Sequence, residues 1–219
     1  MFWLIKSPNY MTTSYYFNLL RSSFENAFGD INVVDSLSNL GISSKNDVFI
    51  VGSVIDAFKL YLKGKKRIVA WVQGVIPEES YMSRASLLRK RILEMIEKYV
   101  LKRLTFVIFV SESMKLHYEK KYRIQFQNNY YIIPCFNESS VNREAFFYPS
   151  KYDNNVFTYV GSLHKWQCFP ETVELYREIE ERTNYNTHLL VLTPNVEEAK
   201  TIISRKGLKS FEVKYVKQI

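Results

Sequence analysis

The sequence has few cysteines and no arrangement of them that suits a crosslink or a zinc ion. Cys135 and Cys168 are the only two among 219 residues; they lie far apart and form no CxxC pair. Disulfide scaffolds and structural zinc sites need closely spaced Cys or His residues. We therefore expect two reduced, buried thiols and no metal site.

Long apolar runs and targeting signals are also lacking. No apolar run approaches the roughly 18–20 residues of a membrane-spanning helix. The opening MFWLIKSPNY has neither the charged start nor the small-residue cleavage site of a signal peptide. Internal repeats and low-complexity segments are absent too. These absences predict a cytoplasmic, globular protein.

Several catalytic and nucleotide-binding signatures are missing. The sequence contains neither GxGxxG nor GxxxxGK[ST], which disfavours a dinucleotide-binding fold of the usual kind and a P-loop hydrolase. Its three histidines do not cluster, and no nucleophile elbow or Ser-His-Asp order is visible. A hydrolase of the triad type is therefore not expected.

The charge that is present is basic and unevenly placed. The net charge is +8; residues 1–150 carry 20 Lys/Arg against 13 Asp/Glu, while residues 151–219 carry 10 against 9. This excess predicts an anionic partner for the first part of the chain. A nucleic acid is not expected, because the basic residues concentrate in one segment without an RNP-like, helix-turn-helix or zinc-finger pattern.

Apolar runs of strand length alternate with helix-length segments along the chain. Most runs are nearly continuous, which is typical of strands covered on both faces. The alternation predicts an α/β fold with a doubly wound parallel sheet: a Rossmann-like domain over 1–150 and a partial second Rossmann-like domain over 151–219, with a polar linker at 137–155. The expected strands are 2–7, 31–36, 47–53, 67–74, 105–112, 130–136, 156–162, 187–194 and 211–216.

The turn GSLHKW, residues 161–166, follows one of these strands and precedes a helix. Ligands of parallel sheets bind at the carboxyl ends of the strands. Gly161 allows close approach of the backbone, while the helix amides and the Lys165 ammonium favour an anion. The turn is therefore a candidate diphosphate site. The alternative is that Gly161 only permits the turn and Lys165 is solvated.

The order of several landmarks resembles one enzyme family. AWVQGVIPEES, FVIFVSESMKLHYEKKY, YYIIPCFNE, FTYVGSLHKWQ and HLLVLTPN follow one another as in retaining family-four glycosyltransferases of the two-Rossmann-domain (GT-B) architecture, notably bacterial enzymes that build capsule and other surface polysaccharides. The resemblance covers essentially all 219 residues. It implies a hexosyltransferase that moves sugar from a nucleotide-sugar to a surface-polysaccharide or lipid-linked glycan, without metal or cofactor.

The resemblance also implies roles for particular residues, although it supplies no catalytic base. Lys165 would neutralise the charge that grows on the departing diphosphate. Ser162 stands where the family frequently has Arg, and Trp166 where it has Gly. The implied sites are the donor phosphates (Gly161, Ser162, His164, Lys165), the nucleotide-side loop (Thr193, Pro194, Asn195) and the acceptor-side cleft (Asn9, Gln73, Ser111).

The resemblance further implies that part of the donor pocket is missing. The family places two glutamates, seven residues apart, at a point that would lie beyond residue 219. We therefore expect a donor site that is incomplete in this chain, or one that a partner chain or oligomer completes. The alternative function is a non-catalytic binding or scaffold module of the same architecture, serving a partner glycosyltransferase or a membrane.

The segment from Tyr81 to Arg103 is a candidate membrane-surface helix. It carries seven Lys/Arg against two Glu, with apolar residues at helical spacing. A basic amphipathic helix binds an anionic membrane surface, here the inner face of the cell membrane, with about 1 kcal/mol for each nearby basic residue. The alternative is that the apolar stripe packs into the core. The basic residues expected at the membrane are Arg84, Arg89, Lys90, Arg91 and Lys98.

Overall fold

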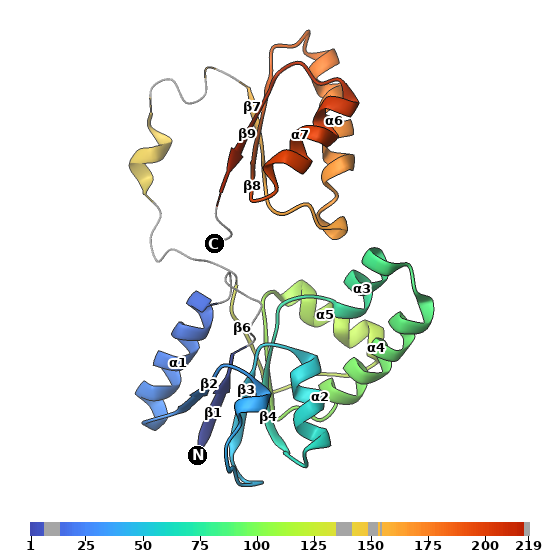
Figure 1. The fold of residues 1–219 in the computed structure, drawn as a ribbon. Helices are drawn as coiled ribbons and strands as arrows, with labels where there is room; N and C mark the ends of the chain where they lie inside the picture. Colours follow the sequence, from blue (N-terminus) through green and yellow to red (C-terminus); the bar gives the residue numbers. More distant parts are fainter. Residues whose placement is uncertain (7–13, 135–141, 149–152, 154, 217–219) are drawn as a thin grey trace. The chain divides into compact units, whose positions relative to one another are not determined.

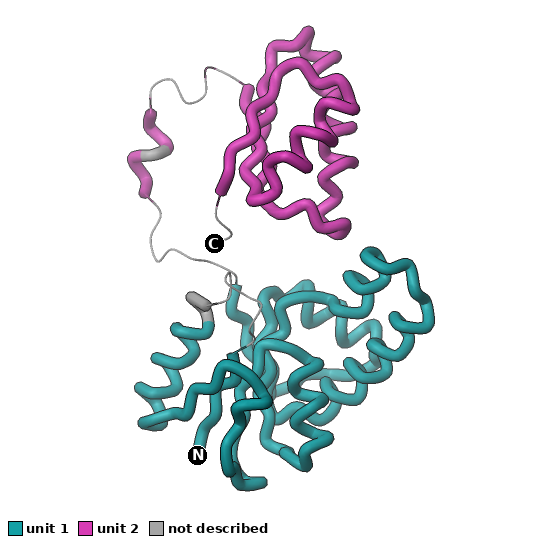
Figure 2. The backbone as a smooth tube through the Cα atoms, viewed as in Figure 1, with its two compact units in different colours: residues 1–137 teal, residues 138–219 magenta. Residues whose placement is uncertain are grey.

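The computed structural model describes residues 1–6, 14–134, 142–148, 153 and 155–216. The chain divides into two compact units, unit 1 over Met1–Asn137 and unit 2 over Glu138–Ile219 (Figure 2). The described stretch 142–148, which contains the 3-10 helix η3 (Arg143–Phe146), is thus grouped with unit 2.

Unit 1 is built on a six-stranded, wholly parallel sheet in the order β2-β1-β3-β4-β5-β6 (Figure 1). The chain runs from β1 outward to β2 and then crosses to β3 on the other side of β1. The order therefore reverses between β1 and β3, as in doubly wound sheets. The strands are β1 (Phe2–Ile5), β2 (Asn32–Val34), β3 (Val48–Val51), β4 (Arg67–Val72), β5 (Phe106–Phe109) and β6 (Tyr130–Ile132).

Helices cover both faces of this sheet. Helix α1 (Ser14–Phe28) lies on one face, and α2 (Val54–Leu62), α4 (Leu87–Leu101) and α5 (Glu112–Tyr122) lie on the other (Figure 1). Consecutive strand residues therefore enter two different cores. Phe49 belongs to the core under α2, α4 and α5, whereas Ile50 belongs to the core under α1. Unit 1 confirms the expected Rossmann-like α/β class.

The basic segment expected as one helix is two helices. Helix α3 (Ile76–Arg84) ends at Ala85, which has a left-handed conformation with φ 52°. Helix α4 then begins after Ser86, whose hydroxyl accepts a hydrogen bond from the Arg89 amide at 3.3 Å. Such an N-cap starts a new helix. Arg84 therefore ends α3 and does not belong to the helix that carries the other four basic residues.

Unit 2 has a three-stranded parallel sheet whose two long helices cover one face. Its strands β7 (Val156–Val160), β8 (His188–Thr193) and β9 (Phe211–Tyr215) pair in sequence order. Because both right-handed crossovers step in the same direction, α6 (Phe169–Arg182) and α7 (Val196–Lys206) lie on the same side (Figure 1). On the other side, Val160 is 68% exposed.

The exposure of β7 corrects the expectation that the strands are covered on both faces. The continuous apolar run predicted a buried strand, yet four of the five residues of β7 are exposed. The run is continuous because its uncovered face is also partly apolar, with Val156 and Val160 pointing away from α6 and α7. Among the described helices, none is both long enough and apolar enough to cross a bilayer.

Candidate functional site

The unit 2 edge, which we define as residues 161–166 and 193–195, lies at the carboxyl ends of β7 and β8. Val160 of β7 pairs with Leu192 of β8 in a parallel register, so the segments after both strands open on the same side. The Gly161 amide is not available to a ligand, because it donates to the Leu192 carbonyl at 3.0 Å. The structure thus brings the two predicted loops of unit 2 together.

Internal hydrogen bonds hold the turn after β7. Ser162 is buried, and its hydroxyl donates to Gln167 Oε1 at 2.8 Å, while its carbonyl accepts from the Tyr159 hydroxyl at 2.6 Å. A Cβ atom on Gly161 would lie 2.9 Å from the same Gln167 oxygen. Gly161 and Ser162 therefore shape the turn by accommodating Gln167. Gln167 could not be predicted from the sequence, because no local pattern marks its contact with Ser162.

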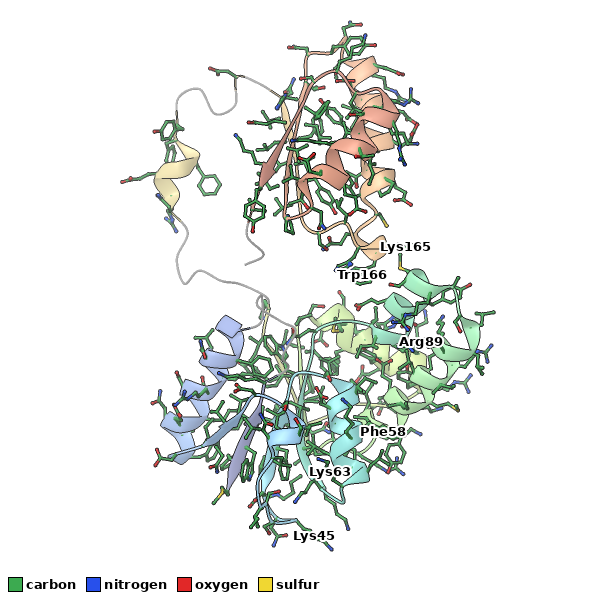
Figure 3. All side chains as sticks on the ribbon, viewed as in Figure 1. Lys45, Phe58, Lys63, Arg89, Lys165 and Trp166 are labelled. Atoms are coloured by element: carbon green, nitrogen blue, oxygen red, sulfur yellow. The ribbon has the colours of Figure 1, made fainter. Side chains whose placement is uncertain are left out.

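Three exposed side chains remain for a ligand on this turn. The 3-10 helix η4 (Lys165–Gln167) carries Lys165, whose ammonium has no partner in the described part of the chain. The His164 and Trp166 rings stack with centroids 4.5 Å apart and an interplanar angle of 19°. Lys165 and Trp166 lie at the same end of unit 2 (Figure 3). A free ammonium suits phosphate oxygens, and an aromatic face suits a base or sugar ring.

Helix α6 begins at Phe169, as expected from the sequence, directly after the 3-10 helix η4. Cys168 occupies its N-cap position in a left-handed conformation, φ 51°, without a side-chain capping bond. Pro170 in the first turn has no amide hydrogen, so it offers no donor to an anion. Glu171 in the same turn complements the helix dipole. The Cys168 thiol is exposed, which corrects the expectation of a buried cysteine; Cys135 lies outside the described residues.

The loop after β8 combines one bonded and one free polar side chain. Thr193 is fully buried, and its hydroxyl accepts a hydrogen bond from the Asn195 amide at 3.2 Å. Asn195 precedes α7, and its own side chain has no hydrogen-bond partner among the described residues. Pro194 between them is half-buried. Asn195 is therefore the residue of this loop that can contact a ligand.

The acceptor-side residues of unit 1 are partly brought together. Gln73 follows β4 and Ser111 follows β5, and these strands are parallel neighbours, so both residues lie at one end of the sheet. The Ser111 hydroxyl caps α5 by accepting from the Met114 amide at 3.1 Å, which gives it a structural role. Gln73 is half-buried. Asn9 lies outside the described residues.

A buried carboxyl supports this end of unit 1. Glu97 is 2% exposed; it accepts hydrogen bonds from the hydroxyl of Tyr122 and from the ammonium of Lys121, at 3.4 Å in the latter case. The Tyr118 hydroxyl lies 3.2 Å from Glu97 and donates to the Gly74 carbonyl at 2.8 Å. Burial raises the pKa of Glu97 even though Tyr122 and Lys121 stabilise its charged form. This network ties α4 and α5 to the turn after β4.

The apolar residues of α4 form an exposed stripe. Leu88 is 73% exposed and Met95 is 65% exposed. Spacings of four, three and four place all members on one helical face. The alternative that the predicted stripe packs into the core is therefore wrong for Leu88, Ile92 and Met95. It holds for Ile96, which is partly buried against the core of unit 1. The four residues of this α4 stripe are Leu88, Ile92, Met95 and Tyr99.

The predicted basic residues of α4 lie beside the stripe. Two of them have a side-chain partner, and the other two have none among the described residues. The Arg89 guanidinium donates from Nε to the Ser80 hydroxyl at 2.8 Å, and Arg89 lies at the α3 end of the helix (Figure 3). Lys90 pairs with Glu94 at 3.6 Å. Arg91 and Lys98 are exposed and have no side-chain partner in the described part of the chain. These last two charges are fully available to an anionic surface.

Comparison with known proteins adds no family to this picture. The sequence matches no protein-family profile, and a search of curated proteins found no match.

Proposed function

We propose that this chain is a nucleotide-sugar-dependent glycosyltransferase of the two-Rossmann-domain type, with the donor diphosphate bound at the unit 2 edge. The observation that carries this proposal is the Lys165 ammonium, for which the described residues supply no partner, on the same turn as the exposed His164–Trp166 stack. Such a pairing suits the diphosphate and the ring of one ligand. The order of sequence landmarks supports sugar transfer as the reaction.

Lys165 has a charge-stabilising role in this proposal. In sugar transfer the bond between the anomeric carbon and the diphosphate oxygen breaks, so negative charge grows on the leaving diphosphate. An ammonium placed beside that oxygen stabilises the transition state more than the ground state. Asn195 would donate a hydrogen bond from the neighbouring loop, while Ser162 holds the turn in shape. Unit 1 would receive the glycan acceptor near Gln73.

Calorimetric titration of uridine and guanosine diphosphates into the full chain tests this proposal. Lys165→Ala should lower the affinity about tenfold, because a charged hydrogen bond to phosphate is lost. Lys209→Ala is the matched control, since Lys209 precedes β9 at the other end of the unit 2 sheet and stacks on Tyr185. An equal loss in both variants would indicate unspecific charge attraction. No binding of either nucleotide would favour the non-catalytic scaffold module.

A second function, docking of unit 1 on an anionic membrane, is favoured by the α4 stripe. Exposed apolar side chains enter the boundary between headgroups and acyl chains, while nearby Lys and Arg attract anionic lipids. Arg91 and Lys98 are exposed and have no side-chain partner within the residues that the structure describes. Docking would place a cytoplasmic enzyme on the inner face of the membrane, where lipid-linked acceptors reside.

Vesicle sedimentation separates this docking from ordinary surface exposure. The chain should sediment with vesicles that contain phosphatidylglycerol and much less with phosphatidylcholine alone. Met95→Glu, in the stripe, should abolish sedimentation, whereas Leu116→Glu, at an exposed position on α5, should not. Equal recovery with both lipids, or equal effects of both substitutions, would remove the membrane proposal.

A further inference from the structure

Unit 1 contains a basic pocket at the end of its sheet opposite Gln73 and Ser111. Its volume is about 360 Å³, which is within the range of small-ligand sites. The end of α2, the turn that leads into β4 and the end of α4 form its walls. The basic pocket is lined by Tyr61, Gly64, Lys65, Lys66, Tyr99 and Arg103.

The basic pocket has three cations and no carboxylate in its lining. The Lys65 ammonium donates to the Ser43 carbonyl at 2.7 Å, and Arg103 donates to the Tyr99 carbonyl at 3.1 Å. Lys66 has no side-chain partner among the described residues. By contrast, the partly buried ammonium of Lys121 lies within 4.0 Å of three glutamates. The positive charge of the pocket is therefore uncompensated, which favours an anion.

A buried hydroxyl in the same pocket also lacks a partner. The Tyr61 oxygen is inaccessible to solvent and has no hydrogen-bond partner within the described residues. Burial raises the Tyr61 pKa to about 12, so the hydroxyl keeps its proton at neutral pH. A buried hydroxyl without a hydrogen bond destabilises the folded state. A ligand that accepts its hydrogen bond would offset part of this effect.

The aromatic walls fix the direction of the Arg103 donors. The Arg103 guanidinium stacks on the Tyr99 ring at 3.8 Å from its centroid. Tyr99 in turn meets the Tyr61 ring edge to face, with centroids 6.1 Å apart. Stacking holds a guanidinium in one plane, which suits two-pronged binding of an oxyanion. The cation and the hydroxyl thus belong to one ordered group.

We propose that the basic pocket binds a phosphate monoester or diester. Its oxygens accept hydrogen bonds from the Arg103 guanidinium and the Lys66 ammonium. On entry the ligand displaces neighbouring side chains far enough to reach the Tyr61 hydroxyl as a third donor. The ligand is either a soluble phosphate ester or the headgroup of an anionic phospholipid, and Tyr99 connects the pocket to the α4 stripe in the second case. The pocket belongs entirely to unit 1, so it is independent of the donor site proposed in unit 2.

Titration of sn-glycerol 1-phosphate and of inorganic phosphate into the full chain, followed by calorimetry, tests the proposal. Both should bind, and Tyr61→Phe and Lys66→Gln should each weaken binding about tenfold, as expected for a lost bond to a charged ligand. Tyr61→Phe removes only a buried hydroxyl that has no partner among the described residues, so the variant should fold at least as stably as the unaltered chain. Lys120→Gln, at an exposed position on α5, removes the same charge elsewhere and should change nothing.

Vesicles with phosphatidylglycerol distinguish the two sources of phosphate. If the ligand is a lipid, Tyr61→Phe weakens vesicle binding and sn-glycerol 1-phosphate competes with the vesicles. If the ligand is soluble, Tyr61→Phe binds sn-glycerol 1-phosphate more weakly but binds vesicles as the unaltered chain does. The proposal is wrong if neither phosphate compound nor the vesicles bind, or if Tyr61→Phe and Lys66→Gln bind all of them as Lys120→Gln does.

Discussion

Individual residues at the unit 2 edge divide into those whose polar atoms are bonded within the protein and those whose polar atoms are free. Ser162 and Thr193 are buried and bonded, whereas Lys165 and Asn195 have free side chains among the described residues. Bonded groups contribute to folding and free groups to recognition. Substitutions at the two kinds of position should therefore have opposite effects on stability and binding.

Ser162→Ala and Asn195→Ala test this division. Ser162→Ala should lower the free energy of unfolding by about 1 kcal/mol, because Gln167 loses its donor, and should leave nucleotide affinity nearly unchanged. Asn195→Ala should lower nucleotide affinity without a comparable loss of stability. Urea unfolding and calorimetric titration measure the two quantities. The division is contradicted if both variants lose stability and affinity in parallel.

Glu97 predicts a pH dependence of stability. Burial raises its pKa in the folded state above the ordinary value of 4.5, so folding favours the protonated form. Its stabilising contribution is therefore present below that value and is lost as pH rises through the folded-state pKa. Glu97→Gln, which cannot ionise, should gain stability relative to the unaltered chain as pH rises.

Urea unfolding of both proteins from about pH 4 to about pH 8 measures the difference in their free energies of unfolding. A carboxyl group with a raised pKa ionises within this range. Glu171→Gln, at an exposed position in the first turn of α6, is the control. A difference between Glu97→Gln and the unaltered chain that stays constant or shrinks with rising pH would contradict the assigned direction.

The break between α3 and α4 determines which residues belong to the helix that we propose binds the membrane. Ala85 has φ 52°, and a left-handed conformation at a helix end is easier for glycine than for alanine. Ala85→Gly should therefore raise the free energy of unfolding by about 0.5–1 kcal/mol. Ser83→Gly, inside α3, should lower it by roughly that amount. Thermal unfolding measures both, and a destabilised Ala85→Gly protein would contradict this view of the break.

The exposed basic residues of α4 should each contribute separately to membrane binding. Arg91→Gln and Lys98→Gln should each weaken binding to phosphatidylglycerol vesicles by about fivefold, since one charge near the surface contributes about 1 kcal/mol. Added salt should reduce the effect of both. Lys120→Gln on α5 is the control. Quantitative sedimentation at two salt concentrations measures these affinities. Vesicle binding that changes neither with salt nor with either substitution would contradict a contribution of Arg91 and Lys98.

The positions of the strands could be predicted from the sequence. Which faces of each strand are covered by helices could not. Alternating apolar and amphipathic segments predicted each of the nine strands found in the described residues, because the period of side-chain exposure is a local property. The same pattern did not predict the uncovered face of β7. Val156 and Val160 are apolar, so the sequence could not distinguish a strand covered on one face from a strand covered on both. It also missed the break at Ala85, where no glycine marks the helix end.

The candidate sites show the same limit. Lys165 could be located from the sequence because strand, turn and helix are contiguous there. Glu97 with Tyr118, and Tyr61 with Arg103, are far apart in the sequence and meet only through the packing of helices. No local spacing predicts such a contact, so these groups became visible only in the structure.

At the scale of the whole molecule, the structure shows where some of the excess basic residues of the first part of the sequence lie. Figure 3 shows Lys45 and Lys63 at the amino-terminal end of the unit 1 sheet, the end that also carries the basic pocket. Phe58 contributes an edge-to-face contact with Tyr99 between α2 and α4. Unit 2 instead offers one free cation and an aromatic stack at its edge. The two units therefore predict separate anionic ligands.

The account depends most on the binding of a nucleoside diphosphate at the unit 2 edge. Amide chemical shifts of the full chain, recorded while uridine diphosphate is added and repeated with guanosine diphosphate, locate that binding directly. We expect the perturbed amides to cluster at residues 161–166 and 193–195. Lys165→Ala should reduce these changes in chemical shift. Perturbations confined to the basic pocket of unit 1, or none with either nucleotide, would contradict binding at the unit 2 edge.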